Sequence, residues 1–467
     1  MSKLVKISNL KKTLRYLKKN GIRPTYYAMR ERMEMGGYAD DYVYEAPSEE
    51  ILKEQEKRAM DMNIKFSILV PAFETKEEYL RAMIDSVLTQ TYGNFELIIS
   101  DASSSEQVKK IIETYTDERI KYRYRGQNAG ISANTSQALV YATGDYAGLL
   151  DHDDVLTRDA LYEMASCIES YKKEGVSLQL LYSDEDKCDS LMEHCYEPNR
   201  KPDFNLDLLL SNNYVCHFLV MQRQLMQELG FRSVCDGAQD YDIVMRAVNV
   251  MMGKDKQQTK KPSLPIAHIP KVLYHWRCHE SSTAENPASK QYAYDAGKRV
   301  VEDFLRARSW KGTVSHLRHL GFYRTDYQPD LLPNREDVAV VGGKLIDRHN
   351  KIAGGIYTAD GTPLYKGLHR EYSGYMHRAS LQQEVEAVDI RCMKVSQGAE
   401  FILEEMTGQP YHPHPGTGRF DWKECFQRGQ MWDEEQILDL SCKFCERIRE
   451  MGYRIVWDPL MTEKLDK

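Results

Sequence analysis

The 467-residue chain lacks three features that would assign it to a special class of protein. No apolar run approaches the roughly 18 residues that a membrane-spanning helix needs. The N-terminus is basic, but no apolar segment typical of a secretory signal follows it. An excess of positive charge is also absent: the formal net charge is -7 and the isoelectric point about 6.1, so no nucleic-acid partner is expected. The length and the 42% hydrophobic content predict a globular cytoplasmic protein of two or three domains.

The ten cysteines lack the compact pattern that would indicate a disulfide framework. Cys167, Cys216 and Cys278, for example, lie in chemically unlike contexts, so we predict reduced thiols, as in the cytoplasm. One CxxC pair, Cys442 and Cys445, has no second pair at zinc-ligand spacing. Because this pair lies in a helix-like segment, we expect it to serve packing.

Residues 1–20 contain no acid but several lysines and an arginine, together with an apolar set at helical spacing. The apolar positions are Leu4, Ile7, Leu10, Leu14 and Leu17. One interpretation is a basic amphipathic helix on an anionic membrane surface, which predicts a peripheral protein at the inner face of the cell membrane. The other is a helix docked on the protein's own body, with its basic face in solvent.

A series of short β-rich runs alternates with helical stretches from Phe66 onward. The runs FSILVPAF, FELIIS, IKYRYR and YAGLLD are separated by predicted helices at residues 76–89, 105–115 and 132–142. This alternation predicts a parallel sheet covered on both faces. Ligands of such sheets bind beyond the carboxyl ends of the strands. Pro71, Asp101 and Asp151 fall where strands stop, so we expect them to converge on one crevice.

The fourth run leads directly into three acids, in the segment GDYAGLLDHDDVL at residues 144–156. A solvated loop would explain these acids at little cost, whereas a bound cation would convert their repulsion into binding. If Asp151 and Asp153 end a strand, alternation places both side chains on one side, with His152 facing away. Two such carboxylates can hold a hard divalent cation and leave positions for water and diphosphate oxygens.

Polar residues also follow the neighbouring strands. Asp101 can accept hydrogen bonds from a base or a ribose, or it can simply cap the next helix. Asn128 and Gly130, in QNAGISANTS, lie at a helix entry where the backbone can approach a ligand closely.

Two later segments add candidate reactive groups. GAQDYDIVMRA places Asp240 and Asp242 at the start of a helix, where the helix dipole favours carboxylates. Capping would explain one of them, and one that faces the crevice can act as a general base. YHWRCHESS places His275, Arg277 and His279 after an apparent strand. This segment combines candidate metal ligands with a cation that can pair with a diphosphate.

In this order, the motifs resemble glycosyltransferase family 2, the inverting enzymes with a GT-A fold, over residues 66–308. The matching segments are FSILVPAF, FELIISDASSS, QNAGISANTS, LLDHDD, GAQDYDIVMRA and KVLYHWRCHESSTA. A narrower resemblance, to the bacterial branch that builds O-antigens, rhamnans and other cell-surface polysaccharides, lies in LLDHDDVLTRDAL, LYSDEDK, KPDFNLDLLLSNNYVCH and HIPKVLYHWR. The combination is specific, although no single motif is.

The resemblance implies a UDP- or dTDP-sugar donor, a Mg²⁺ or Mn²⁺ cofactor and inversion at the anomeric carbon. By position, it implies that the nucleotide-sugar site is formed by Pro71, Asp101, Asn128, Gly130, Asp151 and Arg277. The implied metal ligands are among Asp151, Asp153, His275 and His279, and the implied catalytic base is Asp240. The candidate sugar contacts are Asp184, Asp186, Gln239 and Asp242. Gln239 stands where the family commonly has Glu, which leaves the base intact. Ala102 replaces a frequent second Asp, which affects only auxiliary nucleotide contacts.

These inferences together predict an α/β protein with a Rossmann-like mixed sheet of the GT-A type. The predicted parts are a basic helical N-terminal extension (1–62), a catalytic domain (63–310), a linker (311–333) and a C-terminal half domain (334–467). The half domain looks like the back of a second, degenerate family 2 domain. We expect it to support the acceptor site or the interface of a homo-oligomer.

The favoured function is transfer of a hexose or 6-deoxyhexose, with rhamnose as one candidate, onto a lipid-linked saccharide. One alternative is a non-catalytic scaffold that binds nucleotide-sugar or glycan in a polysaccharide assembly complex. The acids at both the cation and the base positions argue against it, because a scaffold needs no base opposite a metal site. A metal-dependent nucleotide hydrolase is the third alternative.

Overall fold

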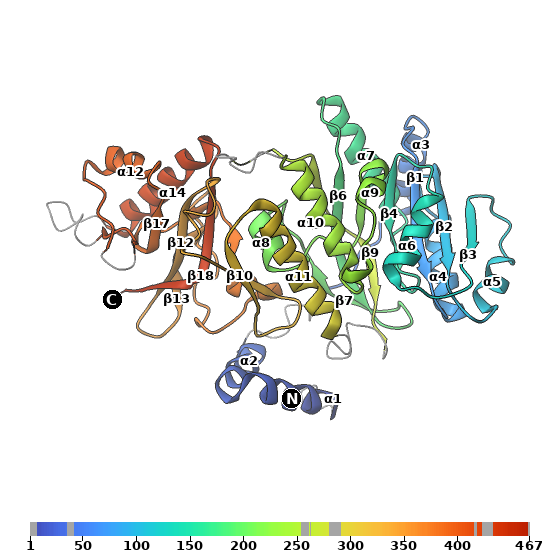
Figure 1. Ribbon diagram of the computed structural model, residues 1–467, viewed down its shortest axis with the longest axis horizontal. Coiled ribbons are helices and arrows are strands. Elements are labelled where there is room, and N and C mark those ends of the chain that lie inside the picture. Colours follow the sequence, from blue (N-terminus) through green and yellow to red (C-terminus); the bar gives the residue numbers. More distant parts are fainter. Residues whose placement is uncertain are drawn as a thin grey trace.

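The computed structural model describes residues 7–34, 42–253, 261, 263–279, 291–414, 418–422 and 433–465, and two β-sheets dominate it (Figure 1). The larger sheet lies in the part of the chain that carries the motifs. The smaller sheet lies toward the C-terminus. Two N-terminal helices cross one side of the molecule.

The larger sheet begins with the four parallel strands that the sequence predicted. These strands lie in the order β3-β2-β1-β4 and are β1 (Phe66–Ala72), β2 (Phe95–Asp101), β3 (Ile120–Tyr124) and β4 (Tyr146–Leu149). The helices between them are α4 (Glu77–Leu88), α5 (Gln107–Ile112) and α6 (Ile131–Val140). Because strand residues alternate in direction, Leu69 packs with α6 while Ile68 packs with α4 and α5. Both faces are therefore covered, which explains why every residue of β1 and β2 is buried.

An antiparallel strand then makes the sheet mixed. β8 (Leu219–Gln222) pairs antiparallel with both β4 and β6 (Leu180–Cys188), and β9 (Ile266–Arg277) pairs parallel with β6. Two short strands, β5 (Val155–Leu156) and β7 (Cys195–Asn199), complete a nine-stranded sheet. The surrounding helices are α7 (Ala160–Lys173), α8 (Leu206–Ser211), α9 (Arg223–Leu229), η1 (Ser233–Cys235), α10 (Gln239–Met251) and α11 (Gln291–Arg308). The mixed Rossmann-like sheet expected from the sequence is confirmed.

The segment predicted as a linker, residues 311–333, contains regular structure instead. β10 (Gly312–His316) and β11 (Tyr323–Tyr327) form an antiparallel hairpin. Its residues Val314 and Tyr323 are buried in the same core as α10 and α11. The hairpin therefore extends the body of the larger unit.

The C-terminal sheet is built around two long parallel strands, β12 (Val338–Ile346) and β18 (Arg454–Lys464). Its shorter strands are β13 (Ile352–Gly354), β15 (Gln383–Glu384) and β17 (Met393–Val395), and β14 (Ile356–Tyr357) pairs with β16 (Ala387–Val388) nearby. The helices are η3 (Tyr375–Ser380), η4 (Ile390–Cys392), α12 (Glu400–Thr407) and α14 (Glu434–Glu450). Cys445, one member of the CxxC pair, is buried in α14 against the backbone of Val388, so it does serve packing.

Buried charges join the two units. The side chain of Arg335 is fully buried and donates to Asp207 of α8 at 3.0 Å and to Asp337 at 2.8 Å. Arg454 of β18 also donates to Asp337, at 2.8 Å. An unpaired charge here would be costly, so the contact requires all partners together.

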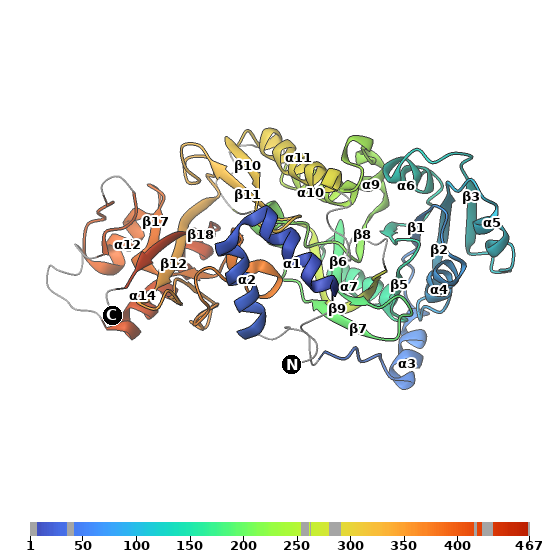
Figure 2. The same cartoon turned by 90° about the horizontal axis from the view of Figure 1, so that it is seen from below.

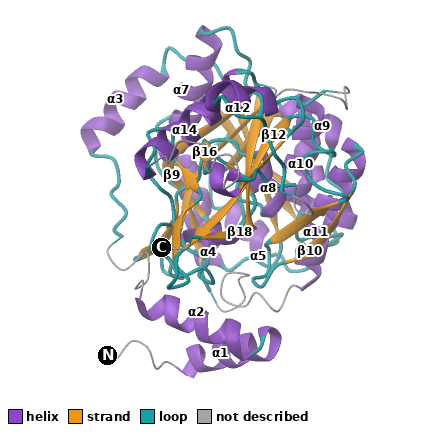
Figure 3. Cartoon of the chain, turned by 90° about the vertical axis from the view of Figure 1, so that its left-hand side faces the viewer, coloured by secondary structure: helices purple, strands orange, loops and turns teal. Residues whose placement is uncertain are grey.

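The N-terminal helices are α1 (Ile7–Asn20), α2 (Ile22–Glu34) and α3 (Glu49–Ala59), the last capped by Ser48 as its sequence predicts. Figures 2 and 3 show α1 and α2 as a pair on one side of the molecule. Glu31 accepts hydrogen bonds from the backbone N–H groups of Ser373 and Gly374, and Tyr27 stacks on His369. These contacts dock α2 on the body of the protein. The two interpretations of residues 1–20 concern α1, whose Tyr16 ring lies 5.5 Å from the ring of His319, and they remain to be tested. None of the described helices combines the length and apolar character that crossing a bilayer requires.

The prediction that all cysteines are reduced is wrong for one pair. Cys188 and Cys195 form a disulfide, with Cα atoms 4.1 Å apart. The antiparallel register of β6 and β7 places them directly opposite each other. Their spacing in the sequence does not reveal this pairing, because it depends on a hairpin that the sequence analysis did not predict.

Candidate active site

A cleft of about 800 Å³ opens beyond the carboxyl ends of β1 and β4. Of the residues predicted for the site, the cleft is lined by Pro71, Asn128, Gly130, Asp151, Asp153, Gln239, Asp240 and His279. They come from five separate segments of the chain, so the fold brings most of the predicted site together. A second hollow, of about 950 Å³, lies between Tyr42, Arg200 and Lys271, and none of the predicted site residues lines it.

The three acids after β4 lie in a turn. The strand ends at Leu149, and the N–H of Asp154 donates to the carbonyl oxygen of Asp151 at 3.3 Å. Strand alternation therefore does not apply, and the prediction that His152 faces away is wrong: His152 lines the cleft with Asp151 and Asp153. The turn therefore places both Asp151 and Asp153 in the wall of the cleft.

Asp154 has a different role. It is buried, and its carboxylate accepts from the N–H of Arg277 at 2.8 Å and from the hydroxyl of Tyr274 at 2.5 Å. Burial raises the pKa of Asp154 well above its ordinary value, and the charges of Asp153 and Asp151 raise it further. Asp154 thus holds β9 against the acidic turn.

The electrostatics of the turn suit a cation. Burial raises the pKa of Asp151, the nearby charge of His217 opposes this, and the charges of Asp153 and Asp240 raise it further. For Asp153, burial is outweighed by the hydrogen bond from His279 and the charge of His152, so its pKa is lowered. The Nε2 atom of His279 lies 2.8 Å from Asp153 Oδ2. Oxygen ligands of this kind, held close together and repelling one another, are those that Mg²⁺ and Mn²⁺ prefer.

Arg277 reaches the same turn from β9. Its Nε donates to the carbonyl oxygen of Asp153 at 2.5 Å, and its Nη1 to that of Ser190 at 2.7 Å. The guanidinium lies over the ring of Tyr79. Its Nη2 is buried without a hydrogen-bond partner among the described residues, and Arg277, which was predicted for the donor site, is not among the residues that line the cleft.

The two acids at the start of α10 have separate roles. Asp240 lines the cleft, and its carboxylate accepts from Asn213 Nδ2 at 3.1 Å and from the N–H of Tyr241 at 2.8 Å. Asp242 is buried between Arg232 and Arg246, which both donate to it. Asp242 therefore holds the helix in place and does not line the cleft.

Asn128 and Gly130 form the entry to α6 and also line the cleft. Asn128 Oδ1 accepts from the N–H of Gly130 at 3.0 Å, and Asp236 Oδ1 accepts from the N–H of Ser132 at 3.1 Å. Gly130 has φ +94°, and a Cβ there would lie 2.1 Å from Asp236 Oδ2. Only glycine fits this position. Asp236, which also lines the cleft, was not predicted from the sequence.

Several predicted residues lie elsewhere. Asp101 is buried, with its carboxylate bound to the Tyr122 hydroxyl and the Ser103 N–H, and it does not line the cleft. Asp184 is hydrogen-bonded to His268, with 2.8 Å between Asp184 Oδ1 and His268 Nε2, and it does not line the cleft either. The structure does not bring His275 to the acidic turn, because His275 faces Asp186 on the neighbouring strand.

The sequence analysis missed a charged pair in the cleft wall. His217 lines the cleft, its Nδ1 lies 3.0 Å from Glu185 Oε2, and its ring stacks on Tyr274. Burial opposes the charge on His217, but the hydrogen bond and the charge of Glu185 raise its pKa to about 9. The buried ammonium of Lys201 lies 3.9 Å from Glu185. Both motifs, LYSDEDK and NNYVCH, were noted, but their pairing across β6 and β8 was not visible in the sequence.

The sequence pattern of glycosyl transferase family 2 matches residues 67–230, which include the four parallel strands and the acidic turn. The chain belongs to this family, and its sheet is the mixed Rossmann-like sheet that was predicted.

Two curated relatives and one solved structure show how far the similarity extends. The chain is 30% identical over 253 residues to the O-antigen biosynthesis protein RfbC of Myxococcus xanthus, covering 53% of this chain and 18% of that protein. It is 30% identical over 196 residues to WcaA of Escherichia coli K12, described as a colanic acid biosynthesis glycosyl transferase, covering 40% of this chain and 68% of WcaA. The mannosyltransferase PcManGT of Pyrobaculum calidifontis, solved with GDP-Man and Mn²⁺, aligns over 64% of this chain and 74% of its own, with 16% identity and a TM-score of 0.39. The chain spans about a quarter or less of the first curated relatives that it matches.

Proposed function

We propose that this protein is an inverting glycosyltransferase of bacterial surface-polysaccharide synthesis. Its donor would be a UDP- or dTDP-sugar carrying a hexose or 6-deoxyhexose, and its acceptor a lipid-linked saccharide. The observation that carries the proposal is one cleft with two carboxylates after β4 and a third, Asp240, at the start of α10. The descriptions of RfbC and WcaA support the polysaccharide context.

The residues present fit a divalent cation. Asp151 and Asp153 share the cleft, and the raised pKa of Asp151 reflects burial and like-charge repulsion that a cation would relieve. When bound, Mg²⁺ or Mn²⁺ would neutralise charge on the departing diphosphate. Asp153 would hold it together with Asp151, and His279 orients the Asp153 carboxylate.

The protein's own groups would supply the rest of the chemistry. The positive charge of His217, which lines the cleft, favours an anionic leaving group there. Asp240 is held by Asn213 and by the N–H of Tyr241, so its carboxylate has a defined direction. It would take the proton from the acceptor hydroxyl, which attacks the anomeric carbon from the side opposite the diphosphate. A single displacement of this kind inverts the anomeric configuration.

The test is the Asp240→Asn variant, which keeps the shape and removes the base. Transfer should fall by about 10²- to 10⁴-fold. A donor is first found by a thermal-shift screen of nucleotide-sugars, and its affinity in the presence of Mn²⁺ is then measured by calorimetry. This affinity should change by less than about threefold, because the proposed role of Asp240 is toward the acceptor hydroxyl and not toward the donor or the cation.

The control is Asp295→Asn, which removes an exposed acid from another helix, α11, outside the cleft. It should leave both measurements unchanged. Full transfer by Asp240→Asn would remove Asp240 from the base role. Donor binding by the wild type without transfer to any lipid-linked acceptor tried would favour the non-catalytic scaffold.

A further inference from the structure

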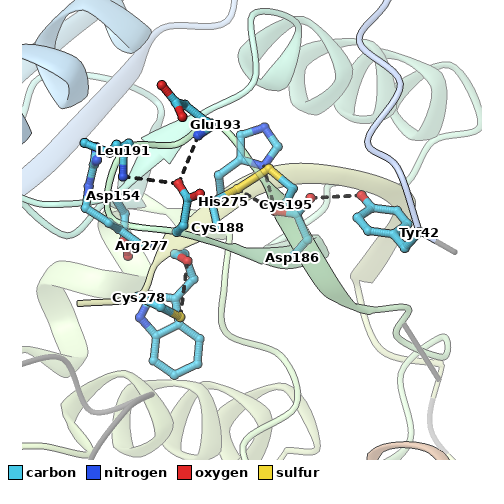
Figure 4. Close-up of a disulfide and its surroundings, with 12 residues drawn as sticks. Tyr42, Asp154, Asp186, Cys188, Leu191, Glu193, Cys195, His275, Arg277 and Cys278 are labelled. Carbon is cyan, nitrogen blue, oxygen red and sulfur yellow. Dashed lines mark hydrogen bonds and ion pairs between the residues drawn. A yellow bond between two sulfur atoms is a disulfide. The ribbon is translucent and has the colours of Figure 1, made fainter. Parts of the chain in front are cut away.

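A cluster of two sulfurs, an imidazole and a carboxylate lies outside the cleft, and all of its members are buried except the half-buried Cys195. Its members are Cys188 and Asp186 on β6, Cys195 on β7 and His275 on β9 (Figure 4). The Asp186 side chain is fully buried and that of His275 is 10% exposed. One ligand atom from each of the four residues lies within 4.8 Å of all the others. The Cys188–Cys195 disulfide holds this arrangement together.

The donor set and its geometry match a tetrahedral transition-metal site. The Nδ1 of His275 lies 3.7 Å from Cys195 Sγ, and Asp186 Oδ1 lies 3.7 Å from Cys188 Sγ. In a tetrahedral zinc site, a sulfur and a nitrogen or oxygen ligand lie about 3.5 Å apart, and two sulfurs about 3.8 Å. The distance from His275 Nδ1 to Asp186 Oδ1, 2.6 Å, would widen to about 3.3 Å. These are side-chain adjustments that leave the paired strands in place.

A second set of contacts orients the cluster. The hydroxyl of Tyr42 donates to Asp186 Oδ2 at 2.9 Å, which leaves Oδ1 directed at the sulfurs and the imidazole. The ring of Tyr44 packs edge-on against His275. Partners of this kind fix the ligands of metal sites. A disulfide alone needs neither an acid nor a histidine beside it.

We propose that the reduced form of this cluster binds one Zn²⁺ through Cys188, Cys195, His275 and Asp186. A dithiol or phosphine reductant supplies two electrons and two protons become bound, so that the disulfide becomes two thiols. Binding of Zn²⁺ then releases both thiol protons, and the proton that Nδ1 shares with Asp186 in the disulfide form moves to Nε2, so that the neutral imidazole can coordinate through Nδ1. The disulfide in the structure is the oxidised, metal-free state of the same site.

The position of the cluster suggests what the ion would do. It would join β6, β7 and β9 at one point, two residues before Arg277, which contacts the acidic turn through Asp153. Zinc here is structural and distinct from the cation of the cleft. It would fix the strand that delivers Arg277 and His279.

The test uses Co²⁺ as a spectroscopic substitute for zinc, added to the full-length protein in a phosphine reductant. With the cleft kept filled by excess Mg²⁺, the wild type should bind one equivalent of Co²⁺, with the visible bands of tetrahedral cobalt and sulfur-to-cobalt charge transfer in the near ultraviolet. Zn²⁺ should displace it with one equivalent. Without reductant, these bands should be absent.

Two variants identify the ligands. Cys188→Ser with Cys195→Ser should abolish the charge-transfer band, and His275→Gln should weaken Co²⁺ binding at least tenfold. The matched control is Cys442→Ser with Cys445→Ser, the other cysteine pair that is close in sequence, which should bind like the wild type. Asp153→Asn should also do so, which separates this site from the cleft.

The fold of each variant is checked by circular dichroism. If the double cysteine variant does not fold, the His275→Gln titration decides. The proposal is wrong if reduced wild type binds no tetrahedral cobalt, or if His275→Gln binds it as tightly as the wild type. The cobalt measurements do not depend on transfer of sugar from the donor, so a negative result here would not contradict the proposed function.

Discussion

The protonation of His217 provides a prediction whose size follows from the structure. His217 is hydrogen-bonded to Glu185 inside the cleft wall, and its pKa is raised from 6.5 to about 9. Burial lowers the pKa, but the hydrogen bond and the charge of Glu185, followed by the charges of Asp151 and Asp154, outweigh it. The rise corresponds to about 3 kcal/mol of preferential stabilisation of the imidazolium in the folded state. The side chain is 23% exposed, so solvent screening reduces this only modestly.

The sign of the pH dependence follows from linkage. Because the folded-state pKa lies above the unfolded one, the full stabilisation is present below about pH 6.5 and is lost as the pH rises to about 9. Burial raises the pKa of Glu185, but the charge of Lys201 and the contacts with His217 lower it to about 2, so Glu185 stays ionised throughout this range. The stability advantage of the wild type over His217→Gln should therefore shrink by about 3 kcal/mol between pH 6 and pH 9.5.

Two measurements check this prediction. Urea unfolding of wild type and His217→Gln at several pH values gives the difference in unfolding free energy. NMR of carbon-labelled histidine identifies the His217 signal as the one missing from the variant, and its titration midpoint should lie near pH 9. The control is His349→Gln, which removes an exposed histidine. A stability difference that is constant with pH, or a midpoint near 6.5, would refute the reasoning.

Two further predictions concern the cleft entry and the N-terminus. Gly130→Ala should destabilise the fold by about 1–3 kcal/mol and weaken nucleotide-sugar binding, because φ is +94° and the new Cβ would meet Asp236. The control is Gly175→Ala: the backbone there also has a positive φ, +81°, but an added Cβ would have no atom within 4 Å. Equal effects of the two variants on donor binding would contradict the reasoning. Deleting residues 1–20 should lower binding to anionic vesicles more than tenfold in a sedimentation assay and should not change binding to neutral ones. Unchanged sedimentation would show that α1, like α2, only docks on the body of the protein.

Much of the site could be predicted because its residues follow strands and helices that are legible locally. The run YAGLL predicted a buried strand, and the acids after it had to lie at the sheet's carboxyl edge. Asp240 was identified by its place at a helix start. The register of β6 was less accessible, so Asp184 and Asp186 were assigned to sugar contacts although they pair with His268 and His275.

The sequence by itself determined the parallel strand series, its family and the position of the acidic turn, because hydrophobic periodicity and motif order act over short distances. Only the tertiary structure decided which of two neighbouring acids, Asp240 or Asp242, lines the cleft, and which of two histidines, His275 or His279, reaches Asp153. It also decided that Cys188 faces Cys195 and that His217 meets Glu185. The physical reason is that such contacts depend on the register and twist of strands that lie far apart along the chain, and a shift of one residue turns a side chain to the opposite face.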